Sequence, residues 1–199
     1  MSISKTVIVN NALTRVGANP VTSIDQDTNN ARIVSRIYEL SLRSILSECK
    51  WNFATKRANL TLSADTLDWY HTQEGEVYVY IKPSDMIRIF GMSDRAAKFR
   101  EEGDYIISNT AGLGVLYVYY LDAPSKYPAA FIDAFADKLS SDIAYMIVNS
   151  ASLGDKYKKI YETVSLERAT AENAQFGVQQ TMKDDEWTLA KYVNTSGDQ

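Results

Sequence analysis

The chain of 199 residues has very little cysteine, histidine or proline: one Cys, one His and four Pro. The single cysteine, Cys49, excludes an internal disulfide and argues against a cysteine-based metal site. The single histidine, His71, excludes a site built on two histidines. No apolar run is long enough to span a bilayer, and residues 1–17 lack the uninterrupted apolar segment of a secretory signal. We therefore expect no metal, no cofactor and no membrane partner.

The chain also lacks an excess of positive charge. It contains 21 Lys and Arg residues and 25 Asp and Glu residues, which gives a net charge of −4. Such a balance does not favour general binding to nucleic acid or to anionic lipid. Hydrophobic residues make up 45% of the chain, which is typical of a folded domain with a core, or of a core with a modest insertion.

The stretch around which the chain is organised, residues 28–57, predicts a long helix that leads into a Trp-x-Phe-Ala corner. Its apolar or small residues recur every three or four positions and so share one face: Ala31, Val34, Ile37, Tyr38, Ser41, Leu42, Ile45 and Cys49. Arg32, Arg36, Glu39 and Arg43 lie on the opposite face. Ile33 and Leu40 form a second stripe, seven residues apart. It is either part of a broad core face or, with Arg36 and Arg43, a contact between subunits.

The remaining segments predict three more helices and a sheet. Residues 4–16 form a first helix, with Ser4 as its cap and Gly17 as its stop. The period changes to that of strands over residues 57–122, where five or six short strands with meander connections are expected. Helix returns near Pro128, and Gly154 is expected to separate it from a fourth helix over residues 155–176.

These elements predict an α+β fold: a four-helix bundle with a small antiparallel β insertion between the second and third helices. The bundle would comprise residues 1–56 and 124–178, and the insertion residues 57–123. Residues 179–199 lose helical periodicity but keep large apolar groups, which suggests an extended C-terminal arm that either folds back or docks on a partner.

The sequence contains little that indicates catalysis, and we expect no enzyme. A Cys49–His71 nucleophile pair is conceivable, but Cys49 belongs to an apolar helix face, where inert buried thiols are common. No glycine-rich phosphate motif is complete. Two alternatives stay open: a carboxylate-dependent glycan hydrolase, whose two facing carboxylates a sequence does not show, and a small binding module.

Four motifs, taken in chain order, resemble the head-to-tail adaptors of tailed bacteriophages, in particular the tail tubular protein A family of short-tailed phages. They are Ala12-Leu13-x-x-Val16-Gly17-x-x-Pro20-Val21-x-Ser23-Ile24, Trp51-x-Phe53-Ala54, Lys82-Pro83-x-Asp85-x-Ile87-Arg88, and Pro128-x-x-Phe131-x-x-Ala134-Phe135. The resemblance covers about residues 10–145.

The resemblance implies a structural protein of the virion, made in the host cytoplasm. Adaptors of this family form a ring, commonly a dodecamer, that joins the portal protein to the distal tail nozzle, a tail tubular protein B-like component, and tail fibres are a further partner. The ring lines the channel through which genomic DNA is ejected, without specific DNA binding. Such a ring is a closed assembly in which one face of each subunit meets a different face of the next.

Under this resemblance the motif residues have structural roles. Gly17 and Pro20 set the exit from the first helix, and Trp51 and Phe53 are anchors at the junction between the long helix and the insertion. Pro83, Asp85 and Arg88 belong to a motif inside the insertion, where Pro83 ends a strand. Asp85 is expected to pair with the nearby Arg88. The C-terminal arm is expected to bind the portal through its large apolar residues, which are the usual source of interface energy: Trp187, Leu189, Tyr192 and Val193.

Overall fold

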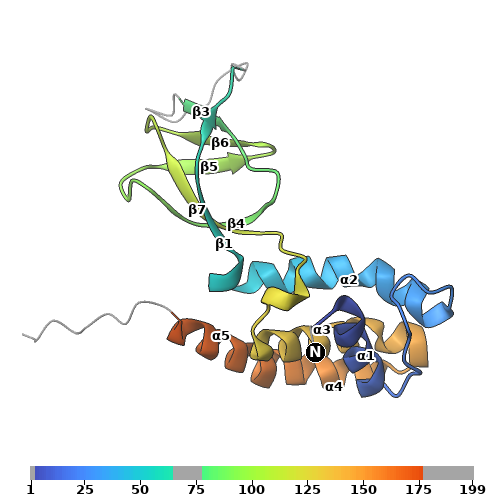
Figure 1. Ribbon diagram of the computed structural model, residues 1–199. Helices are drawn as coiled ribbons and strands as arrows, with labels where there is room; N and C mark the ends of the chain where they lie inside the picture. The colour runs from blue at the N-terminus through green and yellow to red at the C-terminus, as the bar shows by residue number, and fades with distance from the viewer. Residues whose placement is uncertain (1–2, 65–77, 177–199) are drawn as a thin grey trace, which may run out of the picture.

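The computed structural model describes residues 3–64 and 78–176, which form a helical layer and, beside it, a pair of β-sheets (Figure 1). The helices are α1 (Lys5–Arg15), α2 (Asn29–Glu48), α3 (Ala129–Val148), α4 (Ala151–Ile160) and α5 (Leu166–Gln175). Short 3₁₀ turns are η1 (Asn52–Ala54) and η2 (Pro124–Lys126), and η3 (Tyr161–Ser165) is a π-helical segment. Helix α2 lies between the sheets and the other helices.

The first two helices begin close to the predicted positions, but α2 ends at Glu48, before the end of the predicted stretch 28–57. The side chain of Ser4 accepts a hydrogen bond from the Val7 amide, and that of Thr28 accepts one from the Ala31 amide, so both helices have their N-caps. Gly17 follows α1 with φ +75°, a left-handed conformation that glycine adopts without strain. The predicted apolar face of α2 is also confirmed. Its residues are buried in the core or packed against the core: Ala31, Val34, Ile37, Tyr38, Ser41, Leu42, Ile45 and Cys49.

Helix α3 is the centre of the helical layer, and α1, α2 and α4 all pack against it. Eleven of its residues are buried, which explains why its sequence is apolar on nearly every side. The prediction that Gly154 ends the preceding helix is wrong. Asn149, with a left-handed φ of 52°, separates α3 from α4, and Gly154 lies inside α4, where an added Cβ would be 3.4 Å from the Ser141 carbonyl oxygen. From Ala151 onward, α4, η3 and α5 form one continuous helical stretch.

The segment between the helices forms two antiparallel sheets. Their strands are β1 (Thr55–Asn59), β2 (Thr61–Leu62), β3 (Tyr78–Ile81), β4 (Met86–Met92), β5 (Phe99–Glu102), β6 (Tyr105–Ser108) and β7 (Gly114–Tyr119). One sheet has the order β1-β7-β4 and the other β2-β3-β6-β5. The first strand therefore pairs with the last, Thr55 opposite Val118, so the expected meander is wrong.

Each layer has its own hydrophobic core. The larger core joins α1, α2, α3 and the last helical stretch, and it includes Val118 at the end of β7. The smaller core lies between the sheets and is built on Tyr80, Ile106, Leu113, Val115 and Tyr117. Val115 and Tyr117 of β7 face the smaller core, whereas Val118 faces the larger one, because successive side chains of a strand point to opposite sides. The β segment therefore has a hydrophobic core of its own.

The predicted fold class, a four-helix bundle with a small β insertion, is wrong. Within the described residues the protein is a mixed α/β fold of four helices, counting α4 to α5 as one, and two antiparallel sheets with seven strands. The prediction of five or six strands fell short because the helical stretch was extended to residue 57, whereas β1 already begins at Thr55, and its strand state comes from backbone pairing with β7.

Candidate functional site

Trp51 and Phe53 lie in the segment that joins α2 to β1. Trp51 is 1% exposed, and its indole nitrogen donates to the Ile45 carbonyl at 2.8 Å. Its ring is 4.8 Å from that of Phe131 in an edge-on contact, and Phe53 is 4.7 Å from the same ring. Tyr127 completes the cluster at 5.0 Å from Phe131. These rings join the start of β1 to α3, so they hold the sheets at one position on the helical layer.

The polar side of this junction differs from the prediction. Asp85 does not pair with Arg88. Its carboxylate accepts from Lys56 at 2.5 Å and from the Tyr117 hydroxyl at 3.0 Å. Arg88 instead donates to the Ser47 carbonyl at 2.9 Å and thereby links β4 to α2. The predicted pair was close in sequence, whereas the partners that the fold provides come from β1 and β7.

The pKa of Asp85 lies below its usual value. Burial raises this pKa, but the hydrogen bonds from Lys56 and Tyr117 and the positive charge of Lys56 outweigh that effect. A lowered folded-state pKa means that the ionised form stabilises the fold. The contribution is complete above the ordinary aspartate pKa of 3.8 and is lost as the pH falls through the folded-state pKa.

We therefore expect Asp85→Asn to remove part of the pH dependence of stability. Urea unfolding at a series of pH values should show a wild-type advantage over Asp85→Asn near neutral pH that shrinks below pH 3.8. Tyr117→Phe, which removes one of the two hydrogen bonds, is expected to give a smaller change of the same sign. A wild-type advantage that stays constant down to the lowest pH would contradict the assignment.

Asn173, near the end of α5, is a junction residue that the sequence analysis missed. Its side-chain oxygen accepts from the Asn52 amide at 2.8 Å, and its side-chain nitrogen donates to the Lys50 carbonyl at 2.7 Å. The Asn52 side chain donates back to the Asn173 carbonyl at 2.7 Å. These bonds join residues 121 to 123 positions apart, so no local pattern indicates them. They tie the last described helix to the base of the sheets.

The predicted subunit-interface residues lie together on the side of α2 away from the core. Leu40 is 65% exposed, Ile33 is half-buried, and Arg36 is exposed. Within the described ranges no ion-pair partner of Arg36 is found. Arg43 is already engaged: its guanidinium bonds Glu39 at 2.9 Å and stacks 4.3 Å from the ring centre of Tyr120. The surface available to a partner on this helix is therefore Ile33, Arg36 and Leu40, which we call the α2 stripe.

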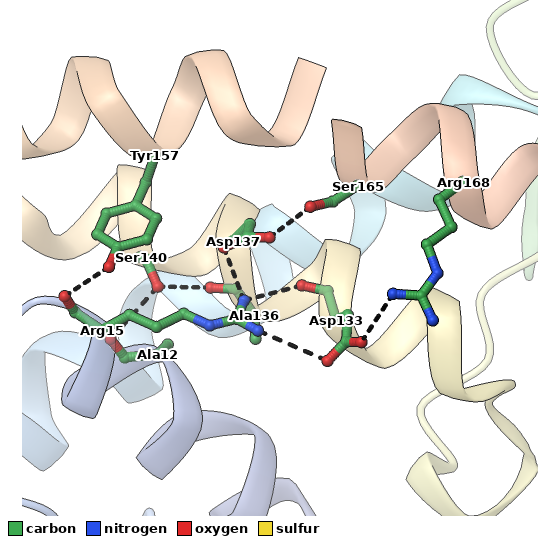
Figure 2. A network of polar contacts seen from close by, with 9 residues as sticks. All are labelled: Ala12, Arg15, Asp133, Ala136, Asp137, Ser140, Tyr157, Ser165 and Arg168. Carbon is green, nitrogen blue, oxygen red and sulfur yellow. Dashed lines mark hydrogen bonds and ion pairs between the residues drawn. The ribbon is translucent and has the colours of Figure 1, made fainter. Parts of the chain in front are cut away.

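A buried polar network holds the helices on the other side of the layer (Figure 2). Arg15 of α1 reaches the Asp137 carboxylate of α3 at 2.8 Å and the Asp133 carbonyl at 2.9 Å. Ser165, the last residue of η3, donates to the other Asp137 oxygen at 2.5 Å. Tyr157 of α4 donates to the Arg15 carbonyl at 2.8 Å. Asp137 is 6% exposed, so this carboxylate depends on Arg15 and Ser165 for its stabilisation.

The remaining predicted residues lie in turns of the chain or in its C-terminal arm. Gly17 and Pro20 form the exposed exit from α1. Half-buried Pro83 begins the turn before β4, and its carbonyl accepts a hydrogen bond from the Met86 amide at 3.0 Å. The C-terminal arm, residues 179–199, lies outside the described residues, and so do its predicted portal contacts: Trp187, Leu189, Tyr192 and Val193.

The environment of Cys49 does not favour a reactive nucleophile of the kind that a Cys49–His71 pair would need. Burial, reinforced by the charge of Glu48, raises the pKa of its thiol to about 12, so the reactive thiolate is scarce at neutral pH. His71 is outside the described residues. In the ranges 3–64 and 78–176, no cluster of three or more His, Cys, Asp or Glu side chains is arranged to hold a metal ion. None of the helices in these ranges is both long and apolar enough to cross a membrane.

Comparison with known proteins adds no assignment. No protein-family model matches this chain, and the search of curated proteins returned no match. Membership of the adaptor family is therefore a prediction from the motifs quoted above.

Proposed function

We propose that this protein is a structural virion component, a head-to-tail adaptor whose copies form a ring between a portal and the distal tail. The observation that carries the proposal is the α2 stripe: a leucine that is 65% exposed, beside an arginine for which the described residues supply no ion-pair partner. A large apolar group beside a free cation on a rigid helix is suited to a protein interface.

The junction described above supports the same proposal. An adaptor transmits a fixed geometry from one ring to the next, so its two layers have to keep one relative position. Trp51, the hydrogen bond from Arg88 to the Ser47 carbonyl and the Asn173 contacts join the layers by packing and hydrogen bonds. Further large apolar groups are exposed on the helices, where neighbouring subunits would bury them: Tyr145, Met146, Val164 and Phe176.

The test is particle mass, by native mass spectrometry or light scattering, of the full chain alone and mixed with a purified portal ring. We expect either a ring of this chain or a stoichiometric complex with the portal ring. Persistence of a small particle that ignores the portal would contradict the proposal.

We expect Leu40→Glu to weaken assembly, because it places a charge in the apolar part of the α2 stripe. Its own stability should change by no more than about 0.5 kcal/mol, as is usual for exposed positions. The matched control is Leu62→Glu on β2, also exposed at 53% and remote from α2. The α2 stripe is not the interface if both variants assemble as the wild type does.

A further inference from the structure

A hollow of about 580 Å³ opens on the sheet β1-β7-β4, toward the end of β1. Its wall is made by β1, by the start of β7, and by Met92 of β4 with the residues that follow it. In the strand register Arg57 is opposite Leu116, and Asn59 is opposite Gly114. The volume is within the range of about 300–1,000 Å³ that is usual for small-molecule sites.

The polar groups around this hollow are mostly donors. Arg57 and Arg95 are exposed, and neither has an ion pair with any residue that the structure describes. The Ser93 hydroxyl oxygen accepts from the Gly114 amide at 2.9 Å, which leaves its own proton free to be donated. No carboxylate is among the lining residues. Two cations and two neutral polar side chains, Ser93 and Asn59, thus surround the space, in a chain whose net charge is negative.

Gly114 allows two polar side chains to come together in the hollow. A Cβ atom at this position would lie 3.3 Å from the side-chain oxygen of Asn59 and 3.3 Å from the Ser93 Cβ. The side chains of Asn59 on β1 and of Ser93, the residue after β4, therefore pack over the glycine. A side chain at position 114 would press against both polar groups that line the hollow.

We propose that this hollow is a binding site for a phosphate ester. The phosphate group would accept hydrogen bonds from Arg57, Arg95 and Ser93, because guanidinium groups match phosphate oxygens in geometry and charge. The apolar part of the wall, Met92 and Leu116, would contact the organic group that carries the phosphate. The site goes beyond the proposed adaptor function and does not depend on it.

A compact phosphate fits the observations better than an acidic peptide. An extended peptide adds to the free edge of a sheet, where backbone groups are unpaired. The hollow lies instead across the central strand β7, which is paired on both sides by β1 and β4. The phosphate could belong to a free nucleotide or to a nucleic-acid backbone, and the experiment has one arm for each.

The experiment records two-dimensional amide NMR spectra of the full chain during titration with inorganic phosphate, a mononucleotide, a short DNA duplex or a glutamate-rich peptide. We expect phosphate and nucleotide to shift the amide signals of Gly114 and Ser93. In the double variant Arg57→Gln/Arg95→Gln, binding should weaken at least tenfold. The control Lys158→Gln/Lys159→Gln removes the same charge from exposed positions on α4 and should bind as the wild type does.

The outcomes separate the possibilities. Loss of binding in the arginine variant alone supports the site. A stronger response to the duplex, falling steeply with salt, identifies a nucleic-acid backbone as the source, and a stronger response to the mononucleotide identifies a free nucleotide. Absence of shifts at Gly114 and Ser93, equal binding by both double variants, or a preference for the peptide would each overturn the proposal.

Discussion

Trp51→Ala is expected to lower the free energy of unfolding by about 3–5 kcal/mol, the usual loss when a buried aromatic residue is truncated. Trp51 is 1% exposed and contacts both Phe53 and Phe131. Removing it leaves a cavity where the sheets meet the helical layer, and it also removes the donor to the Ile45 carbonyl. Urea unfolding measures the loss.

Trp51→Phe is the matched variant for this measurement. It keeps an aromatic ring against Phe131 but loses the indole donor, so it should cost about 1–2 kcal/mol. Because Trp51 joins the two layers, the alanine variant should also unfold with less cooperativity between them. An unfolding curve identical to that of the wild type would show that Trp51 does not have the buried position described.

Arg15→Met is expected to destabilise the protein by about 3 kcal/mol, in the range seen when one partner of a buried ion pair is removed. The substitution keeps much of the side-chain volume but leaves the Asp137 carboxylate, 6% exposed, with only the Ser165 hydroxyl. The Arg15 side chain is 26% exposed, so water screens part of the ion pair, and the expected loss of stability is at the lower end of that range.

Arg168→Met is the control. This arginine is 69% exposed and lies 3.9 Å from the Asp133 carboxylate, so its loss should cost less than about 0.5 kcal/mol. The double variant Arg15→Met/Asp137→Leu also removes the unpaired Asp137 carboxylate and should recover most of the lost stability. If Arg15→Met costs no more than Arg168→Met in thermal and urea unfolding, Arg15 does not stabilise Asp137.

Part of the candidate site could be predicted from sequence because the signals are local. The placement of Trp51 and Phe53 follows from a helix that ends at an aromatic pair. The sequence left Leu40 open between a broad core face and a subunit contact, and the structure places it at the surface, 65% exposed. The partner of Asp85 was missed because the nearest arginine in sequence, Arg88, binds the Ser47 carbonyl instead, whereas Lys56 reaches Asp85 from a residue 29 positions away.

The hollow with Arg57 and Arg95 could not be predicted for the same reason. Its lining comes from three strands whose order, β1-β7-β4, is not the order of the chain. Arg57 and Arg95 are separate charges in the sequence, without a motif that relates them. Only the pairing of β7 with both β1 and β4 brings them to one surface.

The sequence by itself determined the cap of α1 and its glycine stop, the apolar face of α2, the change from helix to strand period close to residue 57, and the aromatic corner that follows α2. Each depends on residues within a few positions of one another, where propensity and periodicity act directly. Tertiary structure alone decided the two sheets and their seven strands within the described residues, the Arg15–Asp137–Ser165 network and the partners of Asp85. These depend on backbone pairing and packing between distant segments, which local pattern does not encode.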